Sequence, residues 1–168
     1  MHRFTEVVPG SSDGHTDAVL TLSFRDRRRS RLRTRLDDGR EIALHLPRGT
    51  ILRDGDRLRA EAGGAMILVR AAAQTLSRVH TADNLRLARA AYHLGNRHVP
   101  VQVGPGWLAY EHDHVLDGMV AELGLRVETE TAPFEPEAGA YVAGHQHHSG
   151  EAKHAGVIHD FALRKAKR

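Results

Sequence analysis

Four histidines occur within a short window of the sequence, and their spacing points to metal chemistry. His93 and His98 lie near the start of this window, and His112 and His114 lie at its end. The residues between them have the pattern of a β-hairpin, which would bring the four side chains into one region. Neutral imidazole suits Zn, Cu, Fe and Ni ions. We therefore expect a protein that binds and carries a metal ion, and not an enzyme.

His98 stands alone just past a predicted helix. Pro100 follows it and biases Val99 toward extended backbone, which sets the direction in which the chain leaves the site. One imidazole cannot hold an ion tightly, but a two-fold symmetric dimer places two copies of one residue at its axis. We therefore predict a homodimer in which His98 is a shared ligand. A purely structural histidine is the alternative, and for a single residue it is the more common case.

The segment His112-Asp113-His114 adds two further imidazoles. If His112 ends a strand, residues i and i+2 point the same way and lie about 7 Å apart, which suits two ligands. If a helix has already begun at Asp113, the two side chains diverge and bind separately. We take Asp113 to be a helix cap and not a ligand.

The end of the chain is rich in histidine. Five of the 13 histidines fall in the final 24 residues, and three of them, His145, His147 and His148, form one group. A short histidine-rich tract is a metal-binding composition in its own right. Residues 142–168 show little apolar pattern, so we expect a flexible tail that is disordered without metal or a partner.

Composition narrows the class of protein. The chain has 168 residues, no cysteine and a formal net charge of +3. The lack of cysteine excludes thiolate metal cages and disulfides. No apolar run approaches the roughly 20 residues of a membrane span, and Met1-His2-Arg3 leads into no signal-peptide core. We expect a cytoplasmic protein with no membrane partner.

Residues 1–72 have the pattern of a β domain. Apolar and polar residues alternate in three runs, Leu20–Phe24, Leu32–Leu36 and Ile42–Leu46. Alternation with period two indicates half-buried strands, and the Asp-Gly turn at Gly39 joins the second run to the third. Strands at this spacing predict a small barrel or sandwich.

Seven arginines lie between Arg25 and Arg35. Such a stripe can bind phosphates, but no aromatic residues alternate with it to stack nucleic-acid bases. We interpret it as the solvated face of a strand, opposite Glu41 on the neighbouring strand. We expect no nucleic-acid partner, and an acidic protein surface is the remaining alternative.

Residues 73–141 are predicted to form a second domain after the alanines at 71–73. Its segments are predicted as strand, helix, strand, strand, helix and strand, which is the ferredoxin-like order, so the whole chain is an α+β protein. The first helix has an expected cap, an apolar stripe and a glycine for the left-handed residue after its end. These are Thr81 or Asp83, then Leu85, Ala88 and Tyr92 with Ala91 filling beside them, then Gly95.

Three stretches resemble the UreE family, the urease accessory proteins that act as nickel metallochaperones. They are Tyr92–Pro100, with its Leu-Gly-Asn-Arg-His motif, Tyr110–Gly118, with its His-Asp-His motif, and Pro133–Tyr141. The resemblance covers most of residues 74–148, and the first 70 residues match in organisation. It implies an N-terminal β domain that contacts partners, like the peptide-binding domain of a chaperone. It also implies a C-terminal domain that dimerises and binds nickel.

The resemblance implies a role for each histidine motif. His98 closes the first motif and is implied to be the nickel ligand at the dimer interface. His112 and His114 are implied to form an accessory metal site. The tail histidines, of which His145 and His147 are the nearest, are implied to complete or feed the central site.

The resemblance also implies the function. The chain is expected to deliver Ni²⁺ for assembly of the urease active site, with the urease apoprotein and the accessory GTPase UreG as partners. Zn²⁺ and Cu²⁺ can bind the same ligands. A general divalent-metal buffer or sensor is the first alternative. A metal-dependent hydrolase is the second, but the chain has no His-Glu-x-x-His motif and only Glu111 as a nearby base.

Overall fold

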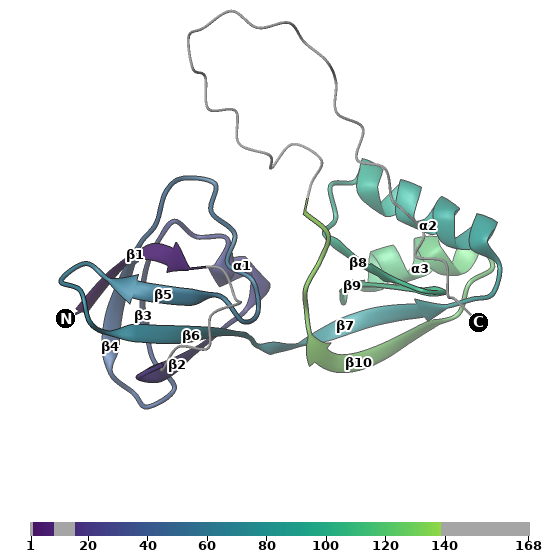
Figure 1. Cartoon of the computed structure of the whole chain (residues 1–168). Coiled ribbons are helices and arrows are strands. Elements are labelled where there is room, and N and C mark those ends of the chain that lie inside the picture. Colours follow the sequence, from purple (N-terminus) through teal and green to yellow (C-terminus); the bar gives the residue numbers. More distant parts are fainter. Residues whose placement is uncertain (1, 9–15, 139–168) are drawn as a thin grey trace, which may run out of the picture.

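The described residues form two β-sheets, each with its own core (Figure 1). The structure is a computed structural model that describes residues 2–8 and 16–138. The first sheet has six strands in the order β2-β6-β5-β1-β4-β3, and the second has four in the order β10-β7-β9-β8. The predicted fold class is confirmed by this arrangement.

The first sheet curls into a nearly closed barrel. At its two edges Asp37 accepts hydrogen bonds from the backbone N–H of Thr21 at 3.0 Å and from its hydroxyl at 2.7 Å. Inward side chains such as Leu20, Leu44 and Leu58 are fully buried in its core. Its elements are β1 (His2–Val8), β2 (Ala18–Leu22), α1 (Phe24–Arg27), β3 (Arg31–Arg35), β4 (Glu41–His45), β5 (Arg57–Ala60) and β6 (Met66–Ala71).

One predicted strand is shorter than expected. The alternation predicted a strand through Phe24, but β2 ends at Leu22 and Phe24 begins the short helix α1. The Ser23 hydroxyl accepts a hydrogen bond from the backbone N–H of Asp26 at 3.2 Å, so Ser23 caps this helix. Phe24 then packs against residues of the second sheet and not into the barrel.

The second sheet has the predicted ferredoxin-like topology. All three strand pairs are antiparallel, and β9 lies between the parallel strands β7 and β8. Both helices lie over one face of this sheet, where they share a core (Figure 1). Its elements are β7 (Ala73–His80), α2 (Asn84–Asn96), β8 (Val101–Gly104), β9 (Trp107–Glu111), α3 (His114–Glu122) and β10 (Val127–Pro133).

The prediction of which face of α2 packs against the core is wrong. Asp83 caps the helix as expected, but Leu85 and Tyr92 are 64% and 65% exposed. The core face instead contains Leu87, Ala90, Ala91 and Leu94, which follow the same i, i+3, i+4, i+7 spacing. The helix therefore has two apolar stripes, and the sequence pattern selected the one that faces solvent.

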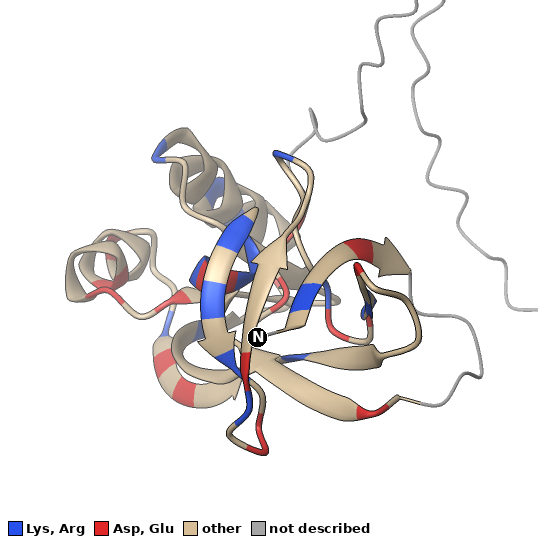
Figure 2. Ribbon diagram, turned by 90° about the vertical axis from the view of Figure 1, so that its left-hand side faces the viewer, with Lys and Arg blue, Asp and Glu red and all other residues tan. Residues whose placement is uncertain are grey.

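Most arginines of the Arg25–Arg35 run lie on the surface, as predicted. Arg31, Arg33 and Arg35 are exposed on β3, and Arg35 forms an ion pair of 2.6 Å with Glu41 across the strand pair. Basic and acidic segments are interspersed over the ribbon (Figure 2). None of the helices in the described ranges is long and apolar enough to span a membrane.

Arg27 departs from this pattern because its side chain is fully buried between the two sheets. Its guanidinium donates to the carbonyl of Leu52 at 2.9 Å, and also to the carbonyl of Phe134 and the carboxylate of Glu135. Arg53 approaches the second oxygen of the same carboxylate at 3.4 Å. Burial lowers the pKa of Arg27, and Glu135 opposes that effect. This cluster joins the barrel to the segment that follows β10.

An apolar contact lies beside this cluster. The rings of Phe24 and Phe134 meet edge to face, with centroids 5.5 Å apart and planes 81° apart. Leu76 and Ala109 from the second sheet complete the buried group. Two features that join the sheets, the ion pair of buried Arg27 with Glu135 and the Phe24–Phe134 contact, thus involve the segment after β10.

We predict that Glu135→Ala destabilises the protein by about 2 to 3 kcal/mol, because it leaves the Arg27 cation buried without its carboxylate. Glu6→Ala is the control, since it removes the carboxylate of an exposed pair with Arg59. That change should cost less than about 1 kcal/mol. Urea unfolding of both variants measures the difference, and equal losses would contradict the role of the buried pair.

Candidate metal-binding site

His98 occupies the position that ends helix α2, with a positive φ of 56°. Its backbone N–H donates to the carbonyl of Gly95 at 2.9 Å, and the N–H of Val99 donates to the carbonyl of Leu94 at 3.1 Å. This pair of bonds is the Schellman motif, whose left-handed residue is usually glycine. His98 is the one non-glycine residue in the described ranges with a positive φ.

The predicted position of the left-handed residue is therefore wrong by three residues. Gly95 lies inside α2, which continues to Asn96, and His98 adopts the conformation expected of a glycine. A left-handed backbone costs a residue with a Cβ roughly 1 to 2 kcal/mol. Residues held in such conformations cluster at functional sites. The backbone of His98 thus gives an independent reason to regard it as functional.

The imidazole of His98 lies at a surface hollow of about 570 Å³. Phe24 and Ile51 line it from the barrel side, and Ala91 of helix α2 and Val101 of strand β8 line it from the other side. The last described residues, 137–138, line it too. Here the backbone N–H of Glu137 donates to the carbonyl of Val101 at 2.8 Å. The described chain therefore ends beside His98, whereas His145, His147 and His148 lie outside the described residues.

His112 and His114 lie on either side of the cap residue Asp113. Strand β9 ends at Glu111 and helix α3 begins at His114, so His112 does not end the strand as the first sequence alternative required. Asp113 caps α3 as predicted, and it accepts hydrogen bonds from the N–H groups of Val115 and Leu116 at 2.8 and 3.2 Å. These two bonds lower the pKa of the Asp113 carboxyl. His114 is exposed in the first turn of the helix.

His112 instead faces the body of the domain. Its Nδ1 lies 3.0 Å from the Ser77 hydroxyl and 3.1 Å from a carboxylate oxygen of Asp117. The other oxygen of Asp117 accepts a hydrogen bond of 2.7 Å from the Tyr110 hydroxyl. The sequence analysis missed Ser77, Tyr110 and Asp117. The one available signal was the position of Asp117, one helical turn after the cap Asp113.

No complete metal site exists within the part of the chain that the structure describes. Residues 2–8 and 16–138 contain no group of three or more His, Asp or Glu side chains able to hold an ion together. His98 and His112 each offer one imidazole at a separate place. Any ion held tightly at either place therefore needs ligands from beyond these residues of one chain.

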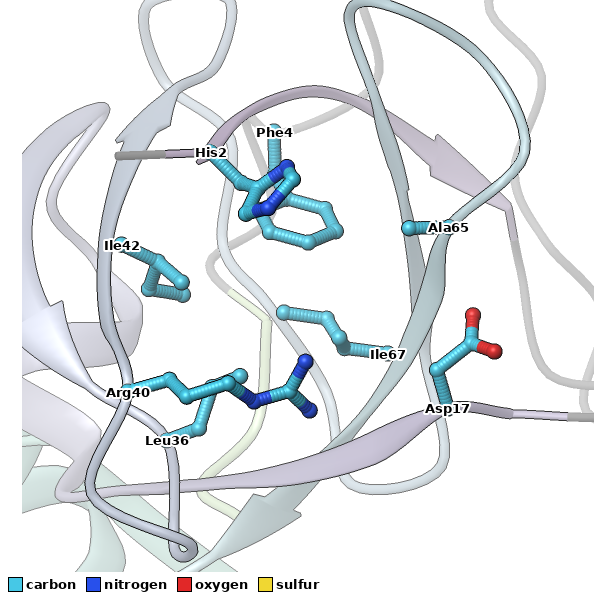
Figure 3. Close-up of a pocket in the computed structure, with 8 residues that line it drawn as sticks. All are labelled: His2, Phe4, Asp17, Leu36, Arg40, Ile42, Ala65 and Ile67. Atoms are coloured by element: carbon cyan, nitrogen blue, oxygen red, sulfur yellow. The ribbon is translucent and has the colours of Figure 1, made fainter.

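A second hollow lies at the mouth of the barrel and has a different character (Figure 3). It measures about 220 Å³, with Phe4, Ile42 and Ile67 among its lining residues. His2 is its single imidazole, and the Arg40 guanidinium extends across the pocket toward the side where Asp17 lies (Figure 3). A cation beside one imidazole disfavours a metal ion, so we place no metal site here.

Comparison with known proteins identifies the family. Residues 4–72 match the N-terminal domain of the UreE urease accessory protein, and residues 74–161 match its C-terminal domain. The chain belongs to the UreE family. The resemblance predicted from three short motifs is therefore confirmed over both domains, including the barrel that shared no specific motif.

Individual UreE proteins are similar to this chain along most of their length. The urease accessory protein UreE of Alkalilimnicola ehrlichii is 55% identical over 141 residues, which cover 84% of this chain and 85% of that protein. The UreE of Pseudomonas putida strain W619 is 58% identical over 123 residues, covering 73% and 76%. The UreE of Vibrio parahaemolyticus is 48% identical over 160 residues, covering 88% and 100%.

The left-handed backbone of His98 in this UreE protein leads to a prediction about stability. His98→Ala and His98→Gly both remove the imidazole, but glycine adopts a φ of 56° without strain. We expect the glycine variant to be more stable than the alanine variant by about 1 kcal/mol in urea unfolding.

Gly95→Ala is the matched control, because Gly95 is helical and a Cβ there meets no atom within 4 Å. Here alanine should be more stable than glycine, by up to about 1 kcal/mol. Equal stability of the two His98 variants would show that the strained backbone costs nothing.

Proposed function

We propose that this chain is a cytoplasmic nickel metallochaperone that works as a homodimer and delivers Ni²⁺ during urease maturation. The urease apoprotein and the accessory GTPase UreG are the proposed partners. The observation that carries the proposal is the single imidazole of His98, held in a strained backbone beside a hollow. Membership of a family of urease accessory proteins supplies the link to urease.

Dimerisation would give a metal ion at His98 a second imidazole ligand. A two-fold axis beside the end of α2 brings two copies of the same imidazole together. Exposed apolar side chains in this domain favour such an interface, because Tyr92 on α2 is 65% exposed and Val103 on the edge strand β8 is 46% exposed. Burying these side chains against a second copy would stabilise the dimer in proportion to the area removed from water.

Further ligands would come from the tail. The described chain ends at Ala138, which lines the same hollow as His98. Seven residues later comes His145, and an extended chain of that length spans at most roughly 25 Å. His145, His147 and His148 can therefore reach His98 of either copy. A tethered ligand acts at high effective concentration, so it can both complete a site and exchange within it.

Imidazole ligands suit the task of a carrier. Neutral histidine binds Ni²⁺ without the negative charge of thiolates, and the chain has no cysteine. Such a site binds its ion yet can release it to an acceptor. Zn²⁺ and Cu²⁺ bind the same atoms, and intrinsic affinity favours Cu²⁺, so nickel specificity must come from metal supply and from partners.

A calorimetric Ni²⁺ titration tests the proposal. We expect His98→Ala to abolish the tightest site, because in a two-fold symmetric dimer this substitution removes both copies of the ligand. His112→Ala and His114→Ala should remove weaker ions and leave the tight site measurable. His45→Ala, an exposed histidine on the barrel, is the control and should change nothing.

Two further measurements complete this test. Sedimentation should show a dimer, and a monomer both with and without Ni²⁺ would contradict the shared site. A chain that ends at residue 141 should bind fewer ions per dimer than the full chain. A tight site that survives in His98→Ala would overturn the proposal.

A further inference from the structure

We infer that Asp117 is a positioning residue for His112: it holds the ring proton on Nδ1 and leaves Nε2 as the atom that binds metal. The contact is direct, since Asp117 Oδ2 lies 3.1 Å from His112 Nδ1. The metal-binding part of this inference rests on the proposed function. The position of the proton does not, because it is a property of the protein without metal.

The position of the proton follows from the chemistry of the pair. An ionised carboxylate has no proton to donate, so it can only accept hydrogen bonds. The hydrogen-bond partner of Nδ1 is the Ser77 hydroxyl, and Asp117 lies beside the same nitrogen as a charge contact at 3.1 Å. The negative oxygen of Asp117 repels a bare lone pair on Nδ1 and attracts a proton there. Nδ1 must therefore carry the proton of the neutral ring, and Nε2 must be the nitrogen with a free lone pair.

Asp117 is itself held in place from a second direction. The Tyr110 hydroxyl donates to its other oxygen at 2.7 Å, and the backbone N–H of Asp117 donates to the carbonyl of Asp113 at 2.9 Å within α3. A carboxylate oxygen can only accept, so the Tyr110 hydroxyl is the donor in this bond. Tyr110 thus holds the Asp117 carboxylate in place beside the His112 ring.

Ser77 is the other residue that could determine which ring nitrogen of His112 carries the proton. Its buried hydroxyl lies 3.0 Å from the same Nδ1 and can donate or accept. If Ser77 donated to Nδ1, the proton would move to Nε2 and block metal binding there. The carboxylate of Asp117 opposes this, because its negative charge 3.1 Å from Nδ1 favours the proton on that nitrogen. Ser77 is then left to accept from Nδ1 or to bond elsewhere.

The consequence is that His112 and His114 are different ligands. A carboxylate behind an imidazole fixes the ring, sets its tautomer and makes the metal-binding nitrogen more basic. His112 has this support and is 41% exposed. His114 is exposed, and no described residue is recorded in a hydrogen bond or ion pair with it. His112 should therefore be the stronger of the two metal ligands.

Nitrogen NMR of the metal-free full chain tests the inference, since protonated and bare ring nitrogens have distinct shifts. The spectrum is recorded at about pH 8, above the usual histidine pKa. The His112 signal is assigned by its loss in His112→Gln. We expect Nδ1 to be protonated in the wild-type protein. A proton on Nε2 there would overturn the inference without any variant.

Variants then identify the residue responsible. Asp117→Ala should shift His112 toward the Nε2-protonated form that histidine prefers in water. Ser77→Ala should leave Nδ1 protonated, and so should the control Glu122→Ala at the other end of α3. If Ser77→Ala shifts the tautomer and Asp117→Ala does not, Ser77 is the determinant and the inference is wrong.

A Ni²⁺ titration in the His98→Ala background, followed at the His112 ring, measures the effect on binding. We expect Asp117→Ala to weaken this site by about tenfold or more. Unchanged affinity would overturn the positioning role. If the wild-type ring has the expected tautomer but binds no Ni²⁺ at all, the proposed function fails at His112 while the tautomer assignment stands.

Discussion

The left-handed backbone of His98 is the central constraint in the structure, because it fixes where the imidazole leaves the end of helix α2. Two hydrogen bonds at the end of the helix hold this conformation, at 2.9 and 3.1 Å. Glycine is the usual residue in such a motif, since it has no Cβ to clash. A histidine here therefore makes the protein less stable than a glycine would, but it supplies an imidazole at the end of the helix.

The contacts between the two sheets place residues 137–138 at the hollow where His98 lies. Arg27 from the barrel reaches Glu135 and the carbonyl of Phe134, just after β10. The same segment continues to Glu137, which is hydrogen-bonded to β8 at the hollow where His98 lies. The barrel thus helps to fix the position of the last described residues, 137–138.

The sequence predicted the features that repeat and missed those that depend on tertiary contacts. Alternation and cap residues were enough to predict the ferredoxin-like order and the caps Asp83 and Asp113. The core face of α2 was missed because the helix has two apolar stripes, and a periodicity does not say which one faces the sheet. Arg27 was missed because its buried partner, Glu135, lies 108 residues away. The support of His112 by Asp117 likewise arises only when α3 packs beside β9.

Two histidines in this UreE protein are thus fixed by different means, His98 by its backbone and His112 by a carboxylate. The central claim is that His98 is completed by a second copy of itself. A crystal soaked with Ni²⁺ and measured at the nickel absorption edge tests this claim most directly. We expect an anomalous peak on a two-fold axis from a Ni²⁺ ion bound by two His98 imidazoles at about 2.1 Å, the usual metal–imidazole distance. Peaks at His112 and His114 with none at His98 would contradict it.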